Sequence, residues 1–196
     1  MIRNLGAISY TMKRQLLLLF SLATFLGIGS CTQDPEFPDV PSLTFREVEQ
    51  SVITIPNQGI AESLILVLRF QDGNGDLGLS SDRSRFPQDF AGDFADNMAY
   101  HFNIVVKTYK KNTAGDFLPL VFQTVPVSYS GRFPRVSTED REEPLEGDIR
   151  YTLNFVKATT GNFIKRGDVL RFEVFIYDRS KNKSNTVMSP DVTFTY

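Results

Sequence analysis

Residues 63–70 read Ser-Leu-Ile-Leu-Val-Leu-Arg-Phe, and an acidic, glycine-containing segment comes directly after them. Side chains alternate between the two faces of a β-strand, so Leu64, Leu66, Leu68 and Phe70 share one face. The stretch therefore predicts a half-buried strand. The composition agrees, because the chain holds 17 Phe and 7 Tyr but no Trp, and aromatic residues favour strands.

The same alternation recurs along the chain, separated by turn residues. Further strands are expected over residues 43–55 (a pair or one bent strand), 100–107, 117–127 (a hairpin over 112–116), 149–155, 170–177 and 187–196. After the N-terminal signal, no segment shows a convincing helical spacing of apolar residues. About seven strands in this pattern predict an all-β, antiparallel sandwich of the immunoglobulin-like or fibronectin-III-like type.

Two long connections interrupt the alternating strand pattern, at residues 78–99 and 128–147. Long loops inside a domain are commonly functional or disordered. The first contains Phe86, Phe90 and Phe94, and we expect it to pack on the domain. The second has an acidic run at 139–143, which is typical of solvated charge.

The N-terminus has the pattern of an export signal: Lys13 and Arg14 precede an apolar run over 16–28 that ends in small residues. The run is too short for a confident membrane-spanning helix. Met12 is an alternative start of the same signal. Residues 1–30 contain three basic and no acidic side chains, so residues 31–196 carry 18 basic and 23 acidic ones, a formal net charge of −5. This acidic balance argues against nucleic-acid binding.

Residues 28–31, Ile-Gly-Ser-Cys, resemble a lipobox, the signal for attaching diacylglycerol to a cysteine and cleaving just before it. Cys31 is the only cysteine, so it forms no internal disulfide. An ordinary secretory signal with a free thiol is the alternative. Residues 31–41 contain three prolines and three acids, which predict an extended tether. Acidic residues after the lipidated cysteine resemble the surface-export signal of Bacteroidota lipoproteins.

The whole layout resembles immunoglobulin-like lipoproteins of unknown function from Bacteroidota. The resemblance implies residues 1–30 as signal peptide, 31–41 as acylated cysteine and tether, and 42–196 as a single sandwich domain. It also implies that the protein is anchored in the outer membrane. We expect it to face the cell surface, but the sequence does not decide between the two leaflets. It implies a fold and a location, and no activity.

The best candidate for a binding site is the motif at residues 72–78, Asp-Gly-Asn-Gly-Asp-Leu-Gly. Oxygen-bearing side chains at alternate positions suit Ca²⁺, which takes six to eight oxygen ligands. The segment is not an EF-hand, because Leu77 stands where that loop needs glycine and Arg83 where it needs glutamate. In an immunoglobulin-like sandwich the loops after the second and sixth strands lie at one end. Asp178 is then expected to approach Asp72, Asn74 and Asp76, and Asn182 could add an oxygen.

Plain turn chemistry explains the same residues equally well, since Asp-Gly and Asn-Gly are common turn dipeptides. The sequence leaves calcium binding and a simple turn both open. If calcium binds, we expect a structural role that pins the loops.

Catalysis has little support in the sequence. His101 is the only histidine and is expected on the surface or rim, and no nucleophile elbow, zinc helix or phosphate loop occurs. We therefore expect a non-enzymatic, membrane-anchored binding or structural module, with an envelope protein or glycan as its partner. The alternative is a glycan-binding or carbohydrate-active surface lipoprotein, for which Tyr109, Tyr129 and Tyr177 are the candidate rings.

Overall fold

The chain folds around strand β2 (Gly59–Asp72), which lies between β1 (Ser42–Ile55) and β7 (Leu145–Val156) in a three-stranded antiparallel sheet. The computed structural model describes residues 36–137 and 142–196. The core face of β2 carries Leu64, Leu66 and Leu68, all fully buried, as the alternation predicts. β1 is one continuous strand with an irregularity between Phe45 and Glu47, which matches the single bent strand expected there.

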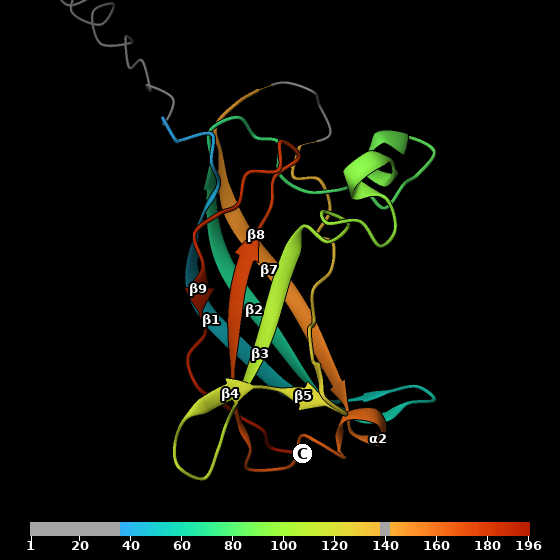
Figure 1. Cartoon of the computed structure of the whole chain (residues 1–196), viewed down its shortest axis with the longest axis vertical. Helices are drawn as coiled ribbons and strands as arrows, with labels where there is room; N and C mark the ends of the chain where they lie inside the picture. The colour runs from blue at the N-terminus through green and yellow to red at the C-terminus, as the bar shows by residue number, and fades with distance from the viewer. Residues whose placement is uncertain (1–35, 138–141) are drawn as a thin grey trace, which may run out of the picture. The chain divides into compact units, whose positions relative to one another are not determined.

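A second sheet faces the first, with the order β10-β8-β3-β4 (Figure 1). Its strands are β3 (Ile104–Lys111), β4 (Phe117–Pro119), β8 (Val169–Ile176), β9 (Val187–Met188) and β10 (Val192–Thr193). β9 and β10 pair with the same strand, β8, and Pro190 between them interrupts the edge, because proline has no amide hydrogen to donate. The described chain is thus a mostly-β, antiparallel sandwich, which confirms the coarse fold prediction.

The two sheets meet through apolar side chains from both inner faces. Phe155 of β7 contacts Phe172 of β8 with ring centroids 6.1 Å apart, and it contacts Phe194 at 4.9 Å. All three rings are buried. Burial of such side chains stabilises a domain by roughly 25 cal/mol per Å² of apolar surface, and this core holds the two sheets together.

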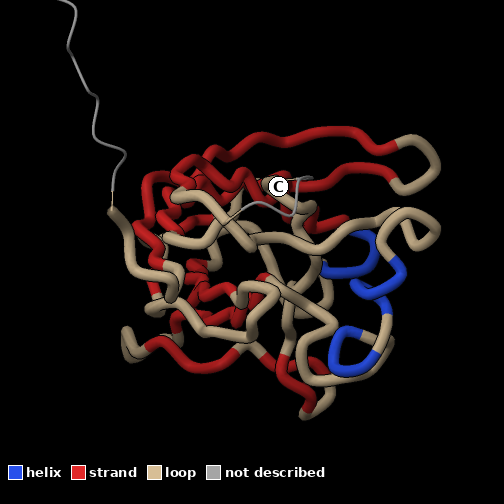
Figure 2. The backbone as a smooth tube through the Cα atoms, turned by 90° about the horizontal axis from the view of Figure 1, so that it is seen from above, coloured by secondary structure: helices blue, strands red, loops and turns tan. Residues whose placement is uncertain are grey.

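The remaining elements are short. The small hairpin of β5 (Val121–Phe122) and β6 (Val125–Pro126) turns at Gln123 and Thr124, both with positive φ (49° and 77°). The helical turns η1 (Pro87–Phe90), η2 (Gly92–Phe94) and α2 (Lys157–Thr160) lie at the periphery of the strands (Figure 2). Among the described residues, no helix has the length and apolar content needed to cross a bilayer.

The connection over residues 78–103 packs on the domain, and it does so through charge as well as through phenylalanine. Asp89 is buried and forms a two-point ion pair with Arg135, at 2.8 and 2.6 Å. The guanidinium of Arg135 also covers the ring of Phe86, and that of Arg132 covers the ring of Phe90. Part of the 128–147 segment therefore packs against the domain, because its arginines contact the 78–103 connection. Most of its acidic run, at 139–141, lies outside the described residues.

Strand β3 begins at Ile104, later than the alternation from residue 100 predicted. The side chain of Asn103 exchanges two hydrogen bonds with the backbone of Phe133 (3.1 and 2.9 Å), which fixes the chain just before the strand. The β1–β2 hairpin, in contrast, extends further than expected. Its tip projects beyond α2 in Figure 1, and Val52, Ile53 and Ile60 are exposed there.

The core face of β2 ends in two buried acids, Glu62 at one end and Asp72 at the other, both fully buried. Glu62 is saturated by donors: it accepts hydrogen bonds from the amides of Thr195 (2.8 Å) and Tyr196 (3.2 Å), from the Thr195 hydroxyl (2.9 Å) and from Gln50. This carboxylate fastens the last residues, 194–196, to the central strand.

Replacing Glu62 by alanine should destabilise the domain by about 3 kcal/mol, because two backbone amides lose a charged acceptor in a buried place. Glu62→Gln should cost less, about 1–2 kcal/mol, since one amide oxygen remains to accept. Urea unfolding curves measure both values. The exposed Glu146→Ala variant is the control, expected within about 1 kcal/mol of the parent. Equal stabilities for Glu62→Ala and the parent would contradict the role of Glu62.

Candidate metal centre

Three aspartates meet at the end of the sandwich where β2 and β8 both finish. Asp72 is the last residue of β2, Asp76 lies four residues further, and Asp178 follows β8. One carboxylate oxygen from each lies within 4.8 Å of the others. The two loops are joined by a backbone bridge between Leu77 and Asp178 and by the amide of Arg179, which donates to the Asp76 carbonyl at 3.1 Å.

Asp72 is the least satisfied member of the triad. It is fully buried, and neither carboxylate oxygen has a hydrogen-bond partner among the described residues. Burial raises the pKa of Asp72 from 3.8 to about 7, and the charges of Asp76 and Asp178 add to that rise. The amides of Gly75 and Asp76 oppose it in part, without making a hydrogen bond of normal geometry.

The other two carboxylates are oriented by the 178–182 loop. Asp76 Oδ2 accepts from the Ser180 amide (2.9 Å) and hydroxyl (2.7 Å), while its buried Oδ1 has no partner among the described residues. Asp178 accepts from the amide and side chain of Asn182, at 2.7 and 2.8 Å. Burial raises the pKa of Asp178, with the Asp76 charge adding to it and Asn182 opposing it.

The side chains of Asn74 and Asn182 form hydrogen bonds within the two loops that carry the triad. Asn74 Oδ1 accepts the amide hydrogen of Asp76 at 3.2 Å, the turn interaction expected of Asx side chains. Asn182 closes its loop around Asp178. Ser180 was not predicted, since a serine in a polar loop carries no sequence signal for its contact with Asp76.

The triad has the donor set of a site for a hard cation. Up to three negative charges converge in a place where Asp72 is shielded from solvent. Buried carboxylates are ordinarily paired, hydrogen-bonded or bound to metal. Ca²⁺ and Mg²⁺ both bind oxygen ligands of this kind, and the triad could therefore hold such an ion.

Other residues singled out in the sequence lie elsewhere. His101 is in the loop before β3, half-buried, with Nδ1 3.7 Å from Asp96. The Tyr109 hydroxyl donates to Glu173 (2.9 Å), and Tyr177 stacks edge-on against Tyr100 (centroids 5.0 Å apart). Tyr129 packs on the buried ring of Phe155. The three candidate tyrosines do not form one common platform. Cys31 and the signal segment lie outside the described residues.

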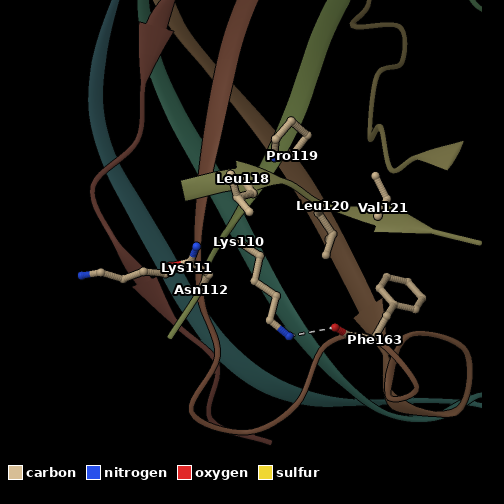
Figure 3. Close-up of a pocket in the computed structure, with 8 residues that line it drawn as sticks. All are labelled: Lys110, Lys111, Asn112, Leu118, Pro119, Leu120, Val121 and Phe163. Atoms are coloured by element: carbon tan, nitrogen blue, oxygen red, sulfur yellow. Dashed lines mark hydrogen bonds between the residues drawn. The ribbon is translucent and has the colours of Figure 1, made fainter. Parts of the chain in front are cut away.

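A hollow of about 310 Å³ lies at the opposite end of the sandwich, beside β4 and β5 (Figure 3). Its apolar lining includes Leu118, Leu120, Val121 and Phe163. Figure 3 shows Lys110 reaching along it to the Phe163 carbonyl, at 3.1 Å. The same ammonium pairs with Asp168 at 2.5 Å, so its charge is already matched.

Comparison with known proteins gives no further guide to the site. No protein-family model matches the chain, and no curated protein or solved structure matches it significantly. A function for this chain is therefore inferred from the geometry of the aspartate triad and from the sequence.

The raised pKa of Asp72 predicts a pH dependence of the cation-free domain. An acid whose pKa is higher in the folded state than in the unfolded state stabilises the fold below the unfolded value, and that contribution is lost as pH rises through the folded one. With pKa values of 3.8 and about 7, stability should fall between about pH 4 and 7, by on the order of 4 kcal/mol at most.

Urea unfolding in chelator at pH 5 and at pH 8 measures this difference. The Asp72→Asn variant isolates it, because a neutral amide carries no ionisation to penalise. We expect that variant to be more stable than the parent at pH 8 and to lose most of the pH dependence. An unchanged slope in Asp72→Asn would show that another group is responsible.

Proposed function

We propose that this chain is a lipid-anchored, non-enzymatic protein of the bacterial cell envelope. Its sandwich, in this proposal, is an immunoglobulin-like binding or structural module stabilised by a calcium ion held by Asp72, Asp76 and Asp178. The observation that carries the proposal is the fully buried Asp72 carboxylate, which has no hydrogen-bond partner among the described residues.

The contrast with Glu62 supports a cation. Both acids lie on the core face of β2 and both are fully buried. Glu62 receives hydrogen bonds from four donor groups, whereas Asp72 faces two further carboxylates. Because the same strand satisfies one buried acid completely, the lack of donors at the other favours a bound ion as its counter-charge.

Calcium is the cation that suits this donor set. It accepts six to eight oxygens in flexible geometry, whereas Mg²⁺ requires near-ideal octahedral geometry and retains several waters. Two carboxylates with free oxygens, together with Asp178, supply much of a calcium shell in a buried place. The site joins two loops that are far apart in the sequence, so a structural role fits it.

The strand order supports the immunoglobulin-like type. Lettered along the chain, β1, β2 and β7 read A-B-E, and β10, β8, β3 and β4 read G-F-C-C′. An immunoglobulin-like sandwich divides its strands between sheets in this way. The cation site then occupies the B–C and F–G loops, which share one end of such a domain.

The lipobox-like residues 28–31 support the membrane anchor, with diacylglycerol on Cys31. The acids after this cysteine, Asp34, Glu36 and Asp39, support export to the outer face of the outer membrane. The partner is proposed to be an envelope protein or a glycan.

A soluble form beginning at Thr32 should melt at a higher temperature with excess calcium than with chelator. At a hundredfold excess over the dissociation constant, native-state binding stabilises by about 2.7 kcal/mol, which corresponds to a rise of roughly 5–10 °C for a domain of this size. Asp72→Asn and Asp76→Ala should abolish the rise.

Asp96→Asn removes an equal charge from an exposed loop carboxylate and serves as the control. It should keep the full calcium response. The proposal fails if the parent melts at the same temperature with calcium and with chelator.

The anchor is tested separately with Cys31→Ser in the full-length chain. The parent should incorporate labelled fatty acid and sediment with membranes, and the variant should do neither, because the hydroxyl cannot form the thioether. Ser30→Ala keeps a small residue before the cysteine and should behave like the parent. Labelled, membrane-bound Cys31→Ser would exclude lipidation at this cysteine.

A further inference from the structure

The cation-binding loop is in direct contact with the segment where the chain enters the domain. The Gly73 amide, next to Asp72, donates to the Pro38 carbonyl at 2.9 Å. The two backbones approach so closely that a Cβ at position 73 would collide with the carbonyl oxygen of Phe37 and with Pro38. Gly73 is absent from the residues with positive φ, so the close approach, and not backbone conformation, requires glycine here.

The other cation-binding loop holds the same segment at its far end. Asn185, seven residues after Asp178, exchanges two hydrogen bonds with the backbone of Leu43: the Leu43 amide donates to Oδ1 at 2.7 Å, and Nδ2 donates to the Leu43 carbonyl at 2.9 Å. The segment before β1 is therefore held at residue 38 by the loop that carries Asp72. It ends at Leu43, which pairs with Phe70 of β2 and is also bonded by the loop that carries Asp178.

We infer that cation binding at the aspartate triad fastens residues 36–41 to the domain, and so controls how much free chain separates the domain from its anchor. The inference rests on the proposed cation site. With a cation, the two loops are drawn to one ion and both contacts persist. Without it, the carboxylates of Asp72, Asp76 and Asp178 repel one another. The two loops then move apart and no longer keep both backbone contacts at once.

The expected change in reach is large for so small a segment. Residues 36–41 precede the first strand, and six residues span about 20 Å when fully extended. Their release would restore the whole of the extended tether that the sequence predicts over residues 31–41. A divalent cation would thus regulate the distance of this domain from the membrane.

The absence of tryptophan from the chain allows a single-site measurement. Phe37→Trp, made in the full-length chain purified in detergent, places one indole on the segment next to Gly73. We expect its fluorescence anisotropy to fall and its emission to shift to the red when calcium is replaced by chelator. Phe122→Trp, on an exposed ring of β5 at the other end, is the control and should not respond.

Calcium binding is measured by calorimetry on the same samples, so that two failures can be told apart. Binding without any change in the fluorescence of Phe37→Trp would overturn the inference and leave the proposed site standing. Absence of binding would overturn both. An equal response in Phe122→Trp would show a global change, and would count against a segment-specific effect.

Gly73→Ala in the Phe37→Trp background separates the contact from the cation. The added methyl group displaces the segment, so the indole at position 37 should be mobile even with calcium, while the three aspartates still bind the ion. Asn185→Ala should have a smaller effect, because Leu43 stays paired with Phe70 of β2. An indole that stays immobile in both double variants would contradict the inference.

Discussion

A carboxylate buried in a protein interior must be matched by donors or by positive charge, and strand β2 presents two of them on the same apolar face. Four leucine and phenylalanine side chains separate Glu62 from Asp72, and both acids are buried at the ends of that face. Glu62 recruits the last residues of the chain as its donors. Asp72 recruits two more carboxylates, and the arrangement of that end of the sandwich depends on this difference.

Around Asp72 the loops are ordered by polar contacts as well as by the buried side chains of Leu77 and Leu79. Ser180 and Asn182 hold Asp76 and Asp178, while Arg135 and Asp89 fasten the neighbouring 78–103 connection. The proposed cation would compensate the negative charge at this end, whereas at the opposite end Glu62 finds its donors within the protein.

The sequence predicted the parts of this structure that depend on local patterns. The alternation of 63–70 identified β2, and the fold it implied brought Asp178 toward Asp72 and Asp76. Contacts between distant polar residues were not predictable, because an arginine such as Arg135 or a serine such as Ser180 has no local signature of its partner. The late start of β3 had the same cause, since Asn103 pairs with Phe133, thirty residues away. Asn74 shows how one spacing suits two roles: its side-chain oxygen accepts the amide hydrogen of Asp76, as in a turn, and its role as a ligand stays a prediction.

The projecting tip of the β1–β2 hairpin has a consequence for solubility. Beyond Ala61, where pairing with β7 ends, the two strands pair only with each other among the described residues. Natural sheets protect such edges with charged side chains, but no charged residue lies between Glu49 and Glu62. Unpaired backbone groups and exposed Val52, Ile53 and Ile60 together make a template for strands of other molecules. If the domain is anchored as proposed, crowding on the membrane would raise the local concentration of that template, and a lysine placed in the tip is the simplest protection against aggregation.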